Sequence, residues 1–261
     1  MKQEDYQKII DMGYEAWVND YMVNRLGNPL TAMPGFAAAM PTTIGRLAEE
    51  VGTPLMNGAN AGTPIEAFCG GRQLMNFFVD MVIEHDLVKE AMDKAFEYNL
   101  ANYKAMLAAK PVGAWVGGWR AAPELMSHDT FMEFVWPYMK QLVDATIEAG
   151  VVPVLHFDSC WDSELETLKE LPEKKCLLML DGTTDMRKAR KVLGDRMCLM
   201  GDVPSRMLAF GTADECYNYV TKLIDDIGPI GTIISSGCDV PLNAKDENVD
   251  AIIQATLDYK V

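Results

Sequence analysis

The segment Val151-Val-Pro-Val-Leu-His-Phe-Asp-Ser-Cys160 decides the fold that we expect for this chain. Its apolar run predicts a β-strand, and side chains two positions apart on a strand lie on the same face. His156 and Asp158 therefore point the same way at the carboxyl end of this strand. An imidazole nitrogen and a carboxylate that meet there form a candidate half of a metal site.

A later strand supplies the other candidate half. The segment Gly231-Thr-Ile-Ile-Ser-Ser-Gly-Cys238-Asp-Val-Pro241 also ends on a metal-binding group, the thiol of Cys238. Enzymes built as α/β barrels place their active sites at the strand ends of one pole. We therefore expect a split metal site with the ligands His156, Asp158 and Cys238. From the residues alone, Asp158 can instead be a hydrogen-bond acceptor that orients the imidazole, and Cys238 can be a small packed side chain.

Short apolar runs alternate with helical patterns along the chain, which predicts βα units around a parallel sheet. The six predicted strands cover residues 54–59, 112–118, 151–158, 175–181, 197–202 and 232–236. The predicted helices cover residues 3–24, 127–150, 185–193, 216–227 and 246–259. Ser127 is a predicted helix cap, and Thr212 with Glu215 forms a predicted capping box. A proline- and glycine-spaced connection through Pro34 and Gly45 separates the first helix from the first strand.

Length, composition and charge limit the class of protein. A chain of 261 residues with 49% hydrophobic content can bury a large core, so we expect one domain over residues 1–261, with residues 1–50 as a helical amino-terminal extension. The net charge of -15 argues against binding to nucleic acid or to an anionic membrane. The sequence has neither an apolar run of about 20 residues nor a secretory core, so we expect a cytoplasmic protein. Its six cysteines are widely spread without a CxxC pair, which favours reduced thiols.

Several motifs in order resemble one enzyme superfamily. They are the run from Arg120-Ala-Ala-Pro-Glu-Leu-Met-Ser127 to Trp136-Pro-Tyr138, then His156, Gly201-Asp-Val-Pro204, and Gly237-Cys-Asp-Val-Pro-Leu-Asn-Ala-Lys-Asp-Glu-Asn-Val249. The chain resembles the uroporphyrinogen decarboxylase superfamily, and within it the corrinoid-dependent methyltransferases. The resemblance extends from about Pro54 to the carboxyl end. It implies a TIM (β/α)8-type barrel.

The resemblance also implies a chemistry. Gly117-Gly-Trp119 stands where the decarboxylase has an aspartate–serine pair, Cys238 stands where it has a histidine, and its arginine-bearing amino-terminal motif has no counterpart here. Methyltransferases that act on coenzyme M hold zinc with a His-x-Cys pair and a later cysteine. His156 and Cys238 match the outer ligands of that set, and Asp158 replaces its middle cysteine, with Cys160 as an alternative two residues on. The resemblance thus implies zinc, a corrinoid (cobalamin) protein as partner and a small methylated substrate, as in O-demethylation.

Other polar and aromatic residues are candidates for the substrate pocket. Trp119 and Arg120 can clamp an aromatic or anionic substrate, or can pack on the following helix. Asp181 and Asp202 end consecutive predicted strands, where they can line a pocket or form turns. These alternatives stay open at the level of the sequence.

The number of predicted strands is smaller than the resemblance implies. Members of the superfamily have eight strands, whereas this sequence offers six, so we expect a barrel that lacks the first two βα units. An open parallel edge exposes unpaired amides, so we expect a homo-oligomer, or a partner chain, a swapped segment or a rearranged helix at this edge. Three hypotheses follow: a zinc- and corrinoid-dependent methyltransferase, a metal-free decarboxylase-like lyase, and a non-catalytic partial subunit that a partner chain completes.

Overall fold

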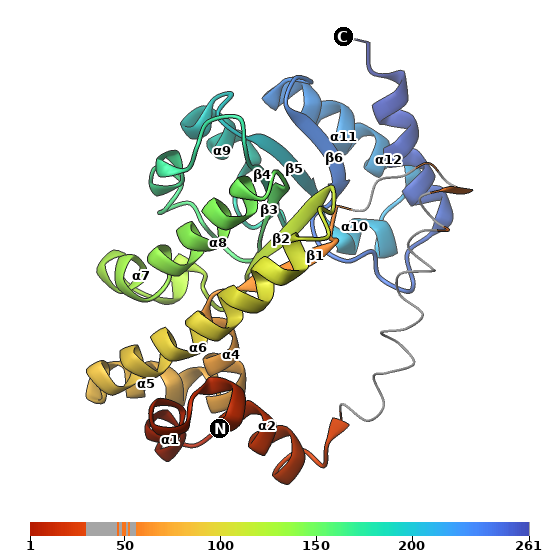
Figure 1. Cartoon of the computed structure of the whole chain (residues 1–261). Coiled ribbons are helices and arrows are strands. Elements are labelled where there is room, and N and C mark those ends of the chain that lie inside the picture. Colours follow the sequence, from red (N-terminus) through yellow and green to blue (C-terminus); the bar gives the residue numbers. More distant parts are fainter. Residues whose placement is uncertain (30–45, 47–48, 51, 53–55, 261) are drawn as a thin grey trace. The chain divides into compact units, whose positions relative to one another are not determined.

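The computed structural model describes residues 1–29, 46, 49–50, 52 and 56–260 of the chain (Figure 1). These residues divide into two compact units. The first unit comprises residues 1–115 and 134–151, and the second comprises residues 116–133 and 152–261. The expected connection through Pro34 and Gly45 lies outside the described residues. No helix in the described part of the chain is long and apolar enough to cross a membrane.

The first unit is mainly helical. Its elements are α1 (Glu4–Met12), α2 (Tyr14–Asn24), β1 (Ala59–Gly62), α4 (Pro64–Arg72), α5 (Leu74–Ile83), α6 (His85–Leu107) and α8 (Trp136–Glu148). A single helix was expected over residues 3–24, but Gly13 has a φ of 84° and divides it into α1 and α2. Glycine tolerates this positive φ because it has no Cβ, so it ends the first helix.

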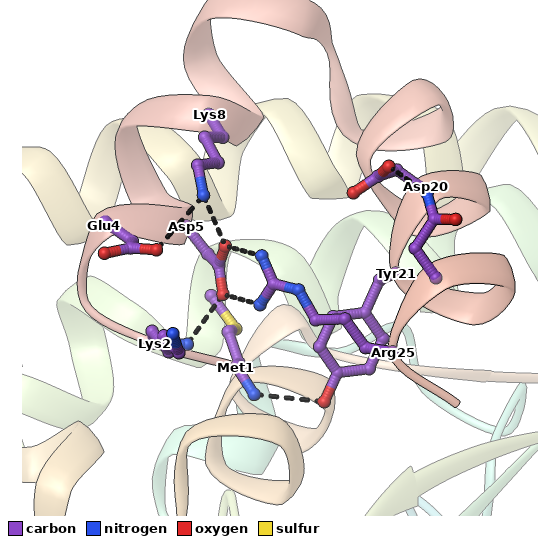
Figure 2. A network of polar contacts seen from close by, with 9 residues as sticks. Met1, Lys2, Glu4, Asp5, Lys8, Asp20, Tyr21 and Arg25 are labelled. Carbon is purple, nitrogen blue, oxygen red and sulfur yellow. Dashed lines mark hydrogen bonds and ion pairs between the residues drawn. The ribbon is translucent and has the colours of Figure 1, made fainter. Parts of the chain in front are cut away.

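A buried polar network joins α1 to α2 (Figure 2). Asp5 is fully buried, and its two carboxylate oxygens each accept a hydrogen bond of 2.7 Å from Arg25. Burial alone would raise the pKa of Asp5, but the hydrogen bonds from Arg25 and from the Lys2 amide outweigh it and lower that pKa. The amino group of Met1 donates to the hydroxyl of Tyr21 at 3.0 Å. These contacts fix the first two helices against each other.

The second unit is built of βα repeats. Its elements are α7 (His128–Phe134), β3 (Val152–Phe157), β4 (Leu177–Leu180), α9 (Met186–Leu193), β5 (Cys198–Val203), α10 (Ser205–Phe210), α11 (Ala213–Ile227), β6 (Thr232–Ser236) and α12 (Asp246–Asp258), with short 3-10 turns at Pro123–Leu125 and Thr167–Glu170. Strand β2 (Gly113–Gly118) contributes to both units. The strands follow the order β1-β2-β3-β4-β5-β6 along the sheet. Neighbours from β3 to β6 pair in parallel, with His156 opposite Met179 and Asp202 opposite Ser235.

Side-chain caps and an apolar cluster hold the last repeats together. The capping box before α11 is confirmed, because the Glu215 amide donates to Thr212 Oγ1 at 3.3 Å and the Thr212 amide donates to Glu215 Oε2 at 2.8 Å. Helices α11 and α12 lie side by side in blue in Figure 1. Their buried side chains pack with those of β5 and α10 in one cluster of Val203, Leu208, Cys216, Val220, Ile224, Ile252 and Ala255.

The first predicted strand is wrong in position. Pro54 and Leu55 lie outside the described residues, residues 56–58 are not in a strand, and β1 begins at Ala59. Its sequence Ala-Asn-Ala-Gly has low strand propensity, so the local pattern does not mark it. The other five predicted strands match β2 to β6 to within two residues at each end.

The single helix predicted over residues 127–150 is also wrong, because it is two helices separated at Val135. Pro137 has no amide hydrogen to donate to the carbonyl four residues earlier, and its ring interferes with that carbonyl. Proline is accepted in the first turn of a helix, and Pro137 therefore stands at the start of α8. The predicted cap at Ser127 is confirmed, since its hydroxyl accepts from the Thr130 amide at 3.2 Å.

Candidate metal centre

Three side chains of the second unit form a candidate metal centre. His156 is the penultimate residue of β3, Asp158 directly follows that strand, and Cys238 lies two residues beyond β6. One ligand atom from each of the three lies within 4.8 Å of the others. The Nε2 atom of His156 is 3.3 Å from Oδ1 of Asp158. The residues that the sequence analysis selected as ligands are therefore close in space, while their role in metal binding stays a prediction.

Curvature of the sheet brings these groups together. Strands β3 and β6 are separated by β4 and β5, and neighbouring strands are about 4.8 Å apart, so a flat sheet would hold them about 14 Å apart. Their carboxyl-terminal loops nevertheless bring Asp158 and Cys238 within 4.8 Å. A sheet that curls in this way is the geometry of a barrel, in which strand ends converge at one pole.

The donor set fits a zinc ion. Two donor atoms on one tetrahedral zinc are about 3.3–3.8 Å apart, given zinc–donor distances of about 2.0–2.3 Å. The 3.3 Å between His156 and Asp158 already equals such an edge, and Cys238 needs a shift of at most about 1.5 Å to complete the set. His156 is 3% exposed, Asp158 is half-buried and Cys238 is exposed, so one side of the site is closed and the other is open. Three protein ligands and an open side are typical of catalytic rather than structural zinc.

The electrostatics of Cys238 also fit a cation. Cys238 is exposed as a residue, but partial desolvation of its thiol and the nearby carboxylate of Asp158 raise the thiol pKa, although a backbone hydrogen bond at Asp239 opposes them. Without a cation the group is therefore a protonated thiol beside a carboxylate. A divalent cation favours the thiolate, which is the form that binds metals.

The loop after β3 holds Asp158 in place. The amide of Asp158 donates to the carbonyl of Gly118 at 3.2 Å, and the indole of Trp161 donates to the carbonyl of Asp158 at 2.8 Å. The Trp161 ring is fully buried and stacks on Phe157 with ring centroids 3.7 Å apart. Gly118 is a glycine because a Cβ there would lie 2.7 Å from the Trp161 ring. The main chain of Asp158 is thus fixed on both sides.

The four other candidate residues do not belong to the ligand group. Asp181 follows β4, and its carboxylate accepts from two backbone amides, those of Ser159 at 2.9 Å and Thr183 at 2.8 Å. Asp202 is buried in β5, where burial raises its pKa although the hydroxyl of Tyr219 donates to it at 2.7 Å. Both carboxylates are therefore engaged by the protein itself.

Trp119 and Arg120 are exposed at the end of β2. The Trp119 ring lies over Gly117, where a Cβ would come within 2.6 Å of it. The substrate role of Trp119 and Arg120 stays a prediction. Cys160 is half-buried, and the ligand group found among the described residues includes Asp158 instead of it.

Sequence reasoning missed the residues that hold the site together. Ser159, Trp161 and Thr184 connect the loop after β3 to the loop after β4, since Thr184 Oγ1 donates to the Ser159 carbonyl and accepts from the Trp161 amide. These hydrogen bonds join residues more than twenty positions apart through backbone atoms, so no local pattern signals them. The only available signal was the stacking potential of Phe157 and Trp161 beside the strand end.

Comparison with known proteins gives one family. Residues 22–259 match the family model "Uroporphyrinogen decarboxylase (URO-D)". Uroporphyrinogen decarboxylase of Flavobacterium johnsoniae is 28% identical over 211 residues, which are 76% of this chain and 58% of that protein. The chloroplastic uroporphyrinogen decarboxylase of Zea mays is 29% identical over 66% of this chain and 42% of its own length. The chain thus spans about half the length of these relatives.

One solved structure extends the likeness to the fold. A methyltransferase from Methanosarcina mazei superposes with a TM-score of 0.65 and 23% identity, over 82% of this chain and 62% of that one. Together with the six-stranded sheet, these likenesses confirm the predicted fold class, an α/β chain that corresponds to part of a barrel.

Proposed function

We propose, from the premise that the chain belongs to the uroporphyrinogen decarboxylase family, that it is a zinc-dependent methyltransferase. In this proposal it moves a methyl group between a small methoxy or methylthio compound and the cobalt of a corrinoid protein. The observation that carries the proposal is the nitrogen, oxygen and sulfur donor set of His156, Asp158 and Cys238 within 4.8 Å at the strand ends. Catalytic zinc sites use these donor types.

The three ligands have distinct tasks. His156 offers Nε2 from the buried side, and as metal ligands Asp158 and Cys238 would supply two negative charges that balance a divalent cation. A bound zinc ion supplies Lewis-acid stabilisation of the negative charge on the oxygen or sulfur atom that loses the methyl group. The exposed position of Cys238 leaves that side of the site open to the methylated compound and to the corrinoid protein.

The carboxylate of Asp158 favours the demethylating direction. A carboxylate is a harder ligand than the thiolate at the matching place in coenzyme M methyltransferases, so it suits activation of an oxygen leaving group better than activation of a thiolate acceptor. We therefore expect the methyl group to pass from substrate to corrinoid. The corrinoid partner and a homo-oligomeric state are parts of the same proposal.

The metal content of the purified protein tests the proposal. We expect about one zinc per chain in protein prepared without added metal, and its loss in the His156→Ala and Cys238→Ala variants, because each removes one of three ligands. Cys160→Ala is the matched control, since Cys160 is a half-buried thiol on the same loop as Asp158 but outside the ligand group. A folded parent protein without bound metal would exclude the zinc mechanism.

A second candidate function is a metal-free decarboxylase-like lyase. The names of the relatives from Flavobacterium johnsoniae and Zea mays favour it. Gly117-Gly118-Trp119 and Cys238 stand at positions where the sequence departs from the decarboxylase pattern. Chelation distinguishes the candidates, because methyl transfer requires the metal and the lyase reaction does not.

A further inference from the structure

We propose that Asp181 is a positioning residue that holds together the two loops of the metal centre; this inference rests on the proposed function. The first loop comprises residues 158–161 after β3 and carries Asp158. The second loop comprises residues 237–239 after β6 and carries Cys238. Asp181 follows β4, between these strands in the order of the sheet.

The side chain of Asp181 fixes the first loop. Its Oδ2 accepts a hydrogen bond of 2.9 Å from the amide of Ser159, the residue next to the ligand Asp158. Ser159 has a φ of 69°, a left-handed conformation that a residue with a Cβ rarely adopts without support. The hydrogen bond to Asp181 and the bond from Thr184 Oγ1 to the Ser159 carbonyl, 3.0 Å long, supply that support.

Hydrogen bonds from Thr183 fix the carboxylate of Asp181. Its Oδ1 accepts from the Thr183 amide at 2.8 Å, and its Oδ2 also accepts from the Thr183 hydroxyl at 3.1 Å. An aspartate that bonds the amide two residues on is a rigid turn former. The oxygen offered to Ser159 is therefore preset in position before any metal binds.

The main chain of Asp181 fixes the second loop. A Cβ at Gly237 would lie 2.5 Å from the Asp181 carbonyl oxygen and 3.0 Å from its Cα, so the backbones of these residues are in direct contact. Gly237 immediately precedes the ligand Cys238. Asp181 thus touches the neighbour of one ligand with its side chain and the neighbour of another with its backbone. Asp181 is therefore in contact with both loops that carry the candidate ligands.

The test uses three variants of the full chain. Asp181→Ala removes both carboxylate oxygens, which accept hydrogen bonds from Ser159 and Thr183. Asp181→Asn keeps one acceptor oxygen, which suffices for the turn at Thr183 but not for Ser159 as well. Asp185→Asn is the matched control, because Asp185 belongs to the same connection and caps α9 by accepting from the Arg187 amide at 2.9 Å. Within the described part of the chain, its hydrogen bond and ion pair are with Arg187 and not with either ligand loop.

Two measurements are needed on each variant. Hydrogen–deuterium exchange of the metal-free protein reports how firmly the two loops are held, and titration with zinc and with cobalt(II) reports metal affinity and ligand geometry. We expect faster exchange in the first loop, whose Ser159 amide loses its acceptor, and a zinc dissociation constant about 10- to 100-fold higher for Asp181→Ala. The change should be smaller in the same sense for Asp181→Asn and absent for Asp185→Asn. The cobalt absorption bands should change shape in the Asp181 variants only.

The outcomes separate this inference from the proposed function. Unchanged exchange and unchanged metal affinity in Asp181→Ala overturn the positioning role. A lower melting temperature with the parent's zinc affinity and cobalt spectrum overturns it as well, because a merely structural residue behaves in this way. A parent protein that binds no zinc overturns the proposed function, and exchange in the metal-free variants then still decides whether Asp181 holds the loops.

Discussion

Asp158 is the residue that distinguishes this candidate site from a thiolate-rich one. Its Oδ1 lies 3.3 Å from His156 Nε2, and its main chain is fixed by Gly118 and Trp161. A carboxylate at this place would give a bound metal one hard oxygen donor beside one nitrogen and one sulfur donor. In the proposed mechanism, the identity of this single side chain would set the balance between leaving-group activation and thiol activation.

Replacement of this carboxylate tests its role as a ligand. We expect Asp158→Cys to bind zinc about tenfold more tightly than the parent, because thiolate is a softer and stronger donor for this ion. With cobalt(II), the charge-transfer absorption from thiolate to metal should become stronger. Asp162→Cys is the control, since it adds a thiol to the same connection at a side chain that binds Lys188 instead of the ligand group. An equal gain in both variants would show that Asp158 is not a ligand.

The sequence predicted the ligands of the candidate site but not their support. His156, Asp158 and Cys238 follow apolar strands, so the alternation of strand side chains and the convergence of parallel strand ends suffice to select them. The sequence left open whether Asp181 lines a pocket or forms a turn, and it did not predict that both of its carboxylate oxygens accept hydrogen bonds from backbone amides. That arrangement depends on the positive φ of Ser159, which no residue pattern in the loop predicts.

At the scale of elements, prediction succeeded where the physical signal is local. Strands β3 and β4 consist mostly of buried apolar residues, and α11 begins at a complete capping box. The position of β1 was predicted wrongly because Ala, Asn and Gly have no preference for strands. The divisions at Gly13 and before Pro137 arise from one residue each.

The packing of α1 on α2 yields a stability prediction. Arg25→Ala leaves the carboxylate of Asp5 buried without its two 2.7 Å hydrogen bonds (Figure 2). We expect the free energy of unfolding to fall by about 2–3 kcal/mol, the cost of losing hydrogen bonds to a buried charged group. Lys94→Ala is the control, because the Lys94–Glu97 pair is exposed and should contribute less than about 0.5 kcal/mol. Urea unfolding measures both, and equal losses would contradict a special role for Asp5.

The pH dependence of this effect has a definite sign. The pKa of Asp5 is lowered in the folded chain, so its contribution to stability is fully present above the unfolded value of about 3.9 and is lost as the pH falls below it. In Arg25→Ala the hydrogen bonds that lower the pKa of Asp5 are absent, so the stability of this variant does not fall for that reason when the pH is lowered. The stability difference between parent and Arg25→Ala should therefore narrow when the pH is lowered from about 6 to about 3. A difference that stays constant over this range would show that Asp5 is not held ionised by Arg25.

The two units of the chain are stabilised by different kinds of interaction. The first unit relies on buried aromatic side chains and on the Asp5–Arg25 network, and it contains none of the three candidate ligands. The second unit contains His156, Asp158 and Cys238, which join the end of β3 to the end of β6. A metal at this site would therefore connect the first and last strands of the βα repeats in the second unit.

Zinc removal should consequently act on the two units unequally. A ligand that binds only the folded state at a hundred times its dissociation constant stabilises that state by about 2.7 kcal/mol. We expect chelation to remove this stabilisation from the second unit, seen as faster hydrogen exchange in β3, β6 and the loops that follow them, while α1 and α6 keep their protection. His156→Ala should exchange like the chelated parent and should not respond to the chelator. An equal increase over both units would contradict a metal site confined to these strand ends, because every proposed ligand lies in the second unit.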